Sequence, residues 1–292
     1  MDAWILWGLA AGLLLGGYDL ATKRAVTNDP ILAVVFWSSV VGAIPFALAI
    51  AANPGWFAIF DLRTQIATLP KSFAMTASWI LAYIAVKKVP ISLAAPVRAS
   101  GPIWTLLGGI VFLSDWLTAL QAAGLVVCVS AYWWFGRIGG RSGMDRRASW
   151  TAGLLMLAAT WLSAATTVYD KWLVASLGLG IWEVQTISAF QRAALAAATF
   201  AVWRFRSVDG SVVPHAPWAT AMVGLSWVGA EAAYFVAVAD AESSVTVLAV
   251  LRRASLFVAV GAGVLLFRES NLREKLCASI LLVAGLAGLI LG

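Results

Sequence analysis

Long apolar runs separated by short polar connections extend over the whole chain. Ten such runs can be placed, each near the roughly 20 residues that an α-helix needs to cross about 30 Å of hydrocarbon. Because hydrocarbon offers no water to backbone N–H and C=O groups, runs of this length are expected to be helices. The first run also carries Asp19 and lacks a basic leader, so it is expected to be a span and not a signal peptide. The expected spans are residues 4–26, 30–52, 69–89, 91–113, 117–136, 150–174, 179–203, 216–239, 243–267 and 272–291.

The composition supports a membrane protein and excludes a soluble enzyme. Apolar residues make up 62% of the 292 residues and charged residues 12%, and the mean hydropathy is +0.89. A soluble domain is typically about 45–50% apolar and about 25% charged. Cys128 and Cys277 lie inside apolar runs without metal-ligand or redox spacing, so they predict ordinary packing. No metal and no cofactor are expected.

Basic residues are concentrated in alternate connections. Connections after odd-numbered spans hold 13 Lys and Arg residues, whereas connections after even-numbered spans hold 2, Arg63 and Lys71. The positive-inside rule then places the odd connections in the cytoplasm and both termini outside it. The net charge of +6 is thereby explained by topology and by contact with anionic membrane lipid, and no nucleic-acid partner is expected. The 13 residues are Lys23, Arg24, Lys87, Lys88, Arg137, Arg141, Arg146, Arg147, Arg204, Arg206, Arg268, Arg273 and Lys275.

A basic, glycine-containing connection at residues 137–149 divides the chain into two halves of five spans, residues 1–136 and 150–292. An odd number of spans per half means that the second half enters the membrane inverted relative to the first. Short matches support a repeat. The sequence therefore predicts an all-α integral membrane protein with ten transmembrane helices as two inverted five-helix repeats, an architecture of transporters. The matches are Arg98-Ala99-Ser100 with Arg253-Ala254-Ser255, Tyr18-Asp19 with Tyr169-Asp170, and Tyr83 with Tyr234.

Charged residues deep in the expected spans are the first candidates for a binding site. Arg98 and Arg253 lie about 10 to 15 Å from the nearer interface at 1.5 Å per residue, and an intramembrane charge is costly unless it meets a partner or a wet cavity. The guanidinium fork suits a carboxylate or phosphate, although an arginine can also hold helices together. Arg252 points about 100° away from Arg253 on a helix and ranks second. Glu231 is placed to neutralise Arg98 or Arg253, to bind an ammonium group, or to carry a coupling proton.

Three further charged residues extend this set. Arg192 lies deep enough in the seventh span to line a cavity. Asp19 and Asp170 come late in their spans, where they are either gating or proton-coupling groups or interfacial charges paired with Lys23 and Lys171.

Aromatic residues and prolines complete the candidates. Tyr83, Tyr234, Trp37 and Trp79 are placed to form a substrate-binding wall or to pack in the core. A helix kink is expected at Pro96 and Pro102, around Arg98, because proline removes a backbone hydrogen bond.

The chain resembles the drug/metabolite transporter superfamily of the EamA type. The resemblance rests on the paired repeat ends, Ala95–Pro102 through Phe112 with Gln121 and Gly124, and Leu251–Ser255 through Glu269 with Gly285. Tyr169-Asp170-Lys171 is similar to a motif of a bacterial subset. The resemblance implies a carrier for small metabolites and names no substrate. Many EamA-type carriers look basic at their termini and even connections, whereas this chain has the reverse pattern.

We expect a secondary transporter, an exporter or exchanger of a small anionic or zwitterionic metabolite such as an amino acid. It would work by alternating access around a central cavity, in the bacterial inner membrane, with coupling to protons or a counter-substrate. A flippase for a lipid-linked substrate and a non-transporting sensor are the alternatives. No Gly-x-x-x-x-Gly-Lys-Ser/Thr loop occurs, and the single histidine, His215, lies at a connection, so an enzyme is not expected.

Overall fold

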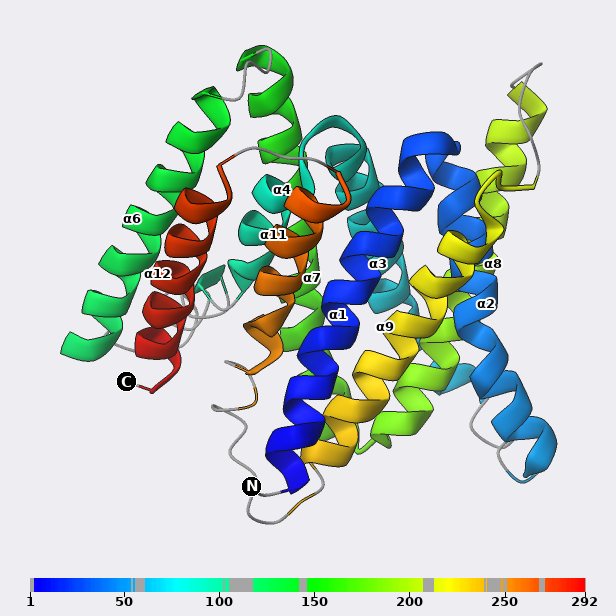
Figure 1. Cartoon of the computed structure of the whole chain (residues 1–292). Coiled ribbons are helices and arrows are strands. Elements are labelled where there is room, and N and C mark those ends of the chain that lie inside the picture. Colours follow the sequence, from blue (N-terminus) through cyan, green and yellow to red (C-terminus); the bar gives the residue numbers. More distant parts are fainter. Residues whose placement is uncertain are drawn as a thin grey trace.

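Each of the ten expected spans contains an α-helix in the described part of the computed structural model (Figure 1). The structure describes residues 3–53, 55, 61–101, 103–104, 118–141, 146–206, 213–238, 240, 248, 251–267 and 271–291. Pro102 and much of the fourth and ninth expected spans lie outside them. The helices are α1 (Ala3–Asn28), α2 (Ile31–Ala52), α3 (Leu62–Lys88), α4 (Ile91–Ala99), α6 (Ala119–Arg141), α7 (Arg146–Ala175), α8 (Ile181–Arg206), α9 (Pro217–Val238), α11 (Ser255–Leu265) and α12 (Leu272–Leu291). A 3-10 turn, η2 (Arg252–Ala254), leads directly into α11.

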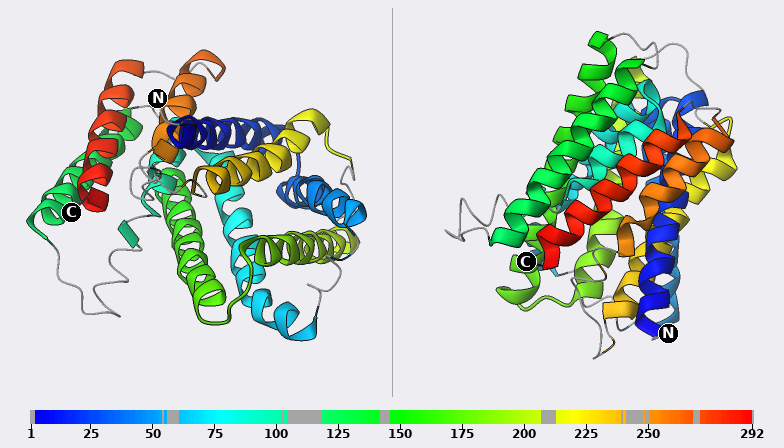
Figure 2. Two further views of the ribbon diagram at one scale, coloured as in Figure 1. Left: turned by 90° about the horizontal axis from the view of Figure 1, so that it is seen from below. Right: turned by 60° about the vertical axis from the view of Figure 1, so that its left-hand side comes forward.

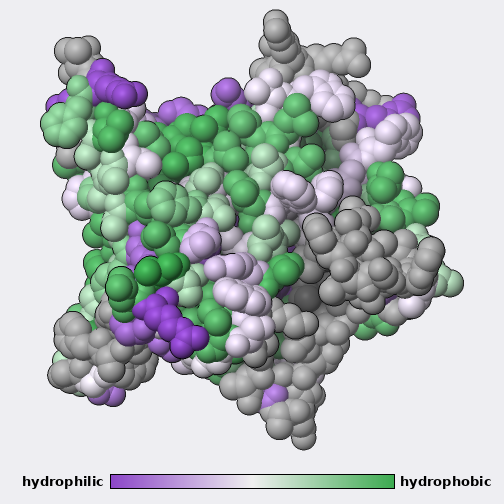
Figure 3. All heavy atoms as spheres, turned by 180° about the vertical axis from the view of Figure 1, so that it is seen from behind, coloured by the Kyte–Doolittle hydropathy of each residue, from purple (hydrophilic) through white to green (hydrophobic). Residues whose placement is uncertain are grey.

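Five of the described helices have the length and apolar composition of membrane spans. By length and composition, α1, α2, α3, the part of α7 from Trp150 to Val174, and α9 are each able to cross a bilayer. Figure 3 shows hydrophobic residues over much of the described surface seen from behind, with hydrophilic residues gathered toward its upper and lower parts. Such a surface suits contact with lipid, and the prediction of an all-α membrane fold is confirmed.

Several helix boundaries differ from those expected, and one of them moves a charged residue into the membrane. Helix α3 begins at Leu62 because the Asp61 side chain caps it, accepting a hydrogen bond from the Thr64 N–H at 3.2 Å. Lys71 is therefore a buried residue of α3 and not a residue of a connection. Helices α6 and α7 also extend into the basic connection, to Arg141 and from Arg146.

The contacts between helices repeat in the two halves, as an inverted repeat requires. Helix α1 packs on α9 as its counterpart α7 packs on α3, and α2 packs on α9 as α8 packs on α3. Helix α1 contacts α11 as α7 contacts α4, while α2–α8, α4–α11 and α6–α12 each join equivalent helices of the two halves. The end-on view shows that α6 and α12 lie together to one side of the other helices (Figure 2). The two halves thus interlock and build a shared centre.

Glycines allow α6 and α12 to pack with their backbones in contact. A Cβ atom on Gly124 would lie 2.7 Å from the Gly285 carbonyl oxygen, and one on Gly285 would lie 2.8 Å from the Cys128 backbone nitrogen. Membrane helices have no hydrophobic driving force to associate, so small residues at their interface favour association through close van der Waals packing. This pair of helices is therefore a fixed element at the edge of the protein.

The connections after α1, α3 and α8 meet at one end of the bundle. The buried Asp29 carboxylate accepts hydrogen bonds from the His215 N–H at 2.7 Å and the Ala216 N–H at 3.2 Å, and its Oδ1 lies 2.8 Å from His215 Nδ1. Lys87 Nζ donates to the Asp29 carbonyl at 3.0 Å, and Lys23 Nζ donates to the Val86 carbonyl at 2.7 Å. Charged side chains here tie the first half of the chain to the second.

We expect the Asp29 contacts to give a stability that depends on acid pH. Burial raises the pKa of Asp29, but the hydrogen bonds from His215 and Ala216 outweigh it and lower the pKa below its ordinary value. The stabilisation is then fully present above the unfolded-state pKa of about 3.9 and is lost as pH falls through the lower folded-state pKa.

Asp29→Asn should cost about 1–2 kcal/mol at pH 7. The measurement is the melting temperature of both proteins in detergent from pH 7 to pH 3. Their difference should shrink as the pH falls, and a constant difference would contradict this account.

Candidate functional site

The first cluster of charges joins α4 to α1. Arg98 forms an ion pair with Asp19, and its guanidinium lies over the Tyr18 ring at 4.5 Å from the centroid. The Tyr18 hydroxyl in turn donates to the Tyr83 hydroxyl at 3.3 Å. The structure therefore brings Arg98, Asp19 and Tyr83 together. Asp19 was also expected to pair with Lys23, and the Lys23 ammonium donates hydrogen bonds to the Val86 and Val89 carbonyls at the end of α3.

Pro96 lies inside α4, two residues before Arg98 and close to the end of the helix. The helix ends at Ala99, three residues after the proline. The Pro96 carbonyl accepts a hydrogen bond from the Tyr132 hydroxyl at 3.0 Å, and the Val97 carbonyl accepts one from Thr160 Oγ1 at 3.5 Å. Side chains from α6 and α7 thus satisfy carbonyls at the helix end, as a broken helix inside a membrane needs.

The second cluster joins η2 to α9. Arg252 Nη2 lies 2.6 Å from Glu231 Oε1, and the guanidinium lies over the Tyr234 ring at 4.4 Å from the centroid. The expectation that Glu231 neutralises Arg98 or Arg253 differs from this geometry. The 100° spacing assumed a regular helix, whereas Arg252 and Arg253 lie in a 3-10 turn. Arg252, and not Arg98 or Arg253, forms the ion pair with Glu231.

The third pair joins α3 to α7 and includes a residue that the sequence reading missed. Lys71 Nζ lies 2.6 Å from Asp170 Oδ1, with 2% of the lysine side chain and 33% of the aspartate side chain exposed. The alternative expectation, a pairing of Asp170 with Lys171, involves a side chain outside the described part of the structure. Lys71 was assigned to a connection because the Asp61 cap was not recognised, and that cap was the available signal.

Arg192 lies at the centre among aromatic rings. Its guanidinium is 4.8 Å from the Trp79 ring centroid, and its Nε donates to the Ser188 carbonyl at 3.3 Å. Trp79 contacts Tyr18, Tyr83 and Trp227 with ring centroids 5.4 to 6.3 Å apart. Trp79, Trp227 and Arg192 also line a cavity, whose free space is about that of one water molecule. Trp227 is not among the candidate residues predicted from the sequence.

Gln191, beside Arg192, holds α8 to α3 through a hydrogen-bonded network that the sequence reading did not identify. Its amide nitrogen donates to the Gln65 carbonyl at 2.8 Å and to Gln65 Oε1 at 2.9 Å. Its amide oxygen accepts from Ser72 at 2.8 Å and Thr68 at 3.3 Å. All of the amide's polar atoms have partners, so we interpret Gln191 as a positioning residue for Arg192.

Trp37 and Arg253 stand apart from these pairs. The Trp37 ring contacts the neighbouring Phe36 with centroids 5.0 Å apart, and Trp37 is absent from the lining of the central cavity. Arg253 is partly buried, and its Nε is buried without a hydrogen-bond partner. Within the described part of the chain, no acidic side chain forms an ion pair with Arg253 or Arg192.

The charged residues of the three pairs, taken together with Arg192 and Arg253, include more cations than acids. Three cations have an acidic partner, and two arginines do not. Because an uncompensated charge is costly in a membrane, this excess is typical of a site that receives a negative group. The residues are Arg98, Lys71 and Arg252 with Asp19, Asp170 and Glu231, and then Arg192 and Arg253.

The described helices make equivalent contacts in the two halves of the chain and hold charges at their shared centre, as in multi-pass membrane proteins of transporter architecture. Residues 2–137 match the EamA-like transporter family, and this match places the first half of the chain in the drug/metabolite transporter superfamily. A solved structure, titled only "Crystal structure of protein", has the same fold. It aligns with a TM-score of 0.67 and 17% identity over 98% of this chain and 96% of the other. No curated protein sequence matches the chain.

Proposed function

We propose that this transporter carries a small anionic or zwitterionic metabolite, such as an amino acid, by alternating access around the centre shared by the two halves. The observation that carries the proposal is that Arg192 and Arg253, both embedded in the membrane, lack an acidic partner among the described residues. A guanidinium binds a carboxylate or phosphate through paired charge-assisted hydrogen bonds. A substrate anion would supply the missing negative charge.

The aromatic rings and the acids next to these arginines suit the other end of a zwitterion. An ammonium group is attracted by an aromatic face, and the Trp227 ring lines the same cavity as Arg192 and contacts Tyr18 and Trp79. Glu231 is 19% exposed at its side chain and interacts electrostatically with Arg192. A substrate with both charges would find a complement for each.

The proposal extends to the coupling of transport and to the orientation of the protein in the membrane. Asp19, Asp170 and Glu231 are the acids whose protonation would release Arg98, Lys71 and Arg252, so a proton or a counter-substrate can exchange for the substrate there. We place the protein in a bacterial inner membrane, among its lipids, with both termini outside the cytoplasm. The basic connections after odd-numbered spans support that orientation.

The test is a thermal-shift screen of the purified protein against amino acids, organic acids, phosphate esters and nucleosides. A ligand at a hundredfold excess over its dissociation constant stabilises the native state by about 2.7 kcal/mol. Arg253→Gln and Arg192→Gln should each weaken binding of the active ligand about 10- to 100-fold, the worth of a charged hydrogen bond. Arg206→Gln, an exposed arginine at the end of α8, is the matched control and should bind as the wild type does.

Each outcome is decisive for the site. A ligand that stabilises all four proteins equally would contradict a role for the two arginines. Stabilisation only by lipid-linked or amphipathic compounds would favour a flippase. Arg98 is a poor test residue, because its loss leaves Asp19 without its partner and affects folding directly.

A further inference from the structure

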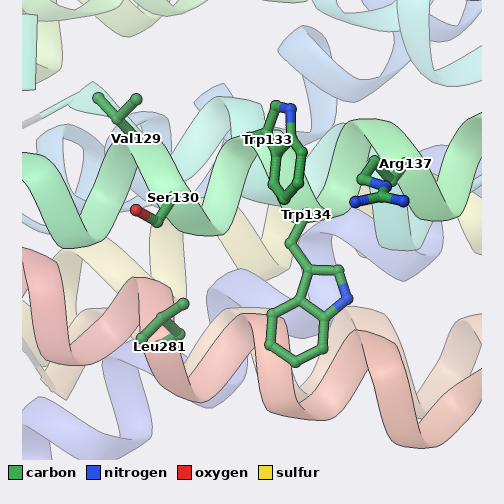
Figure 4. A pocket seen from close by; sticks show the side chains of 6 residues that line it. All are labelled: Val129, Ser130, Trp133, Trp134, Arg137 and Leu281. Atoms are coloured by element: carbon green, nitrogen blue, oxygen red, sulfur yellow. The ribbon is translucent and has the colours of Figure 1, made fainter.

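A groove on the outside of α6 and α12 lies away from the charged centre and is unrelated to it. Its lining consists of Val129, Ser130, Trp133, Trp134, Arg137 and Leu281, and its volume is about 570 Å³ (Figure 4). Helices α6 and α12 form the edge of the protein (Figure 2). The groove therefore opens toward the surrounding membrane and not toward the path between the two halves.

The groove reaches from hydrocarbon depth to the membrane interface. Helix α6 begins at Ala119, and Arg137 lies 18 residues further on, which is about 27 Å along the axis at 1.5 Å per residue. A hydrocarbon core of about 30 Å then leaves the guanidinium at the level of the lipid headgroups. The basic connection that follows α6 lies on the same side of the membrane.

The lining is apolar at one end and cationic at the other. Val129 and Leu281 form the apolar wall, and Val129 is 58% exposed. Arg137 is exposed, lies over the Trp133 ring at 4.7 Å from its centroid, and forms no ion pair with an acid of the described chain. Trp133 and Arg137 lie one helical turn apart on the same face of α6, since residues i and i+4 are neighbours. Indole rings prefer this level of the membrane, between hydrocarbon and water.

We propose that this groove binds an anionic phospholipid from the leaflet on the side of the basic connections. The Arg137 guanidinium binds the lipid phosphate, Trp133 and Trp134 contact the glycerol region, and an acyl chain lies against Val129 and Leu281. Charge complementarity favours this occupant, because a cation at headgroup depth attracts the net negative charge of an anionic lipid, whereas the choline ammonium of a zwitterionic lipid offsets the charge of its phosphate. A second copy of the chain would bring a second unpaired Arg137 to the same contact, which the charges disfavour.

The test compares anionic and zwitterionic lipid on the detergent-purified, full-length protein. Wild type, Arg137→Gln, Trp133→Leu and Arg206→Gln are titrated with dioleoyl phosphatidylglycerol or dioleoyl phosphatidylcholine, and bound lipid is counted by native mass spectrometry. We expect wild type and Arg206→Gln to retain phosphatidylglycerol in preference to phosphatidylcholine. Arg137→Gln should bind phosphatidylglycerol about fivefold more weakly, since one basic residue near an anionic surface contributes about 1 kcal/mol. Trp133→Leu should weaken both lipids.

Three results would overturn the proposal. One is equal phosphatidylglycerol binding by Arg137→Gln and Arg206→Gln. Another is a wild-type response to inorganic phosphate or glycerol phosphate as strong as the response to lipid, which would identify a free-phosphate site. The third is cross-linking between copies of a Val129→Cys variant in membranes, which would place a second copy in the groove. None of these results bears on the arginines of the central site, so the two proposals fail or succeed separately.

Discussion

Replacing Arg98 with alanine is expected to be among the most damaging single changes in this protein. The substitution leaves the Asp19 carboxylate, 10% exposed, inside the membrane without its partner, and it removes the guanidinium that covers the Tyr18 ring. Breaking a buried pair by removing one member typically costs about 3–5 kcal/mol, and the 26% exposure of Arg98 places the expected loss near the lower end. The melting temperature in detergent, followed by size-exclusion chromatography after heating, measures it.

The double variant Arg98→Gln with Asp19→Asn separates charge from packing. Both charges are then absent, so no uncompensated ion remains, and the double variant should be more stable than Arg98→Ala. Arg206→Gln is again the matched control and should melt with the wild type, because its side chain is exposed at a helix end. If the double variant is no better than Arg98→Ala, packing on Tyr18 and not the charge pair explains the loss.

The fold was predictable because the membrane imposes strong rules on sequence. A run of about 20 apolar residues has one stable solution in hydrocarbon, so all ten spans could be placed from hydropathy. The inversion of the halves followed from the odd number of spans, and the repeated helix contacts agree with it. Boundaries were less accurate where polar residues start a helix, as at Leu62, because the Asp61 cap and not hydropathy sets that end.

The candidate site was predictable in its members but not in its pairings. Arg98, Glu231 and Asp170 were recognisable as costly intramembrane charges, because depth along a helix can be read from sequence. Which acid meets which base depends on helix rotation and on the 3-10 turn before α11, and neither is encoded in a local pattern. Gln191 was not singled out because an uncharged amide is unremarkable in sequence, and its network with Gln65, Thr68 and Ser72 exists only when α3 and α8 pack together.

The charges break the symmetry that the backbone keeps, and this difference has a functional consequence. Arg98 pairs with Asp19, but their counterparts Arg253 and Asp170 do not pair with each other. Asp170 instead binds Lys71 of the other half, and Arg253 keeps a buried Nε without a hydrogen-bond partner. A perfectly symmetric pairing would neutralise both arginines. Under the proposed function, the asymmetry leaves a positive group available for a substrate, and alternating access would break the Lys71–Asp170 bond between the halves.

The Lys71–Asp170 bond predicts an unequal effect of removing its two members. Asp170→Ala strands a lysine whose side chain is 2% exposed, and we expect a loss of about 3–5 kcal/mol or loss of folded protein. Lys71→Met leaves an aspartate that is 33% exposed and can be hydrated, so its cost should be about 1 kcal/mol.

Melting temperatures of the two variants, and of Lys71→Met with Asp170→Asn, measure the difference. The double variant should be more stable than Asp170→Ala, since no buried charge is left alone. Equal losses from the two single variants would show that Asp170 is as buried as Lys71, and the bond would then lie within a packed core and not beside a water-accessible path.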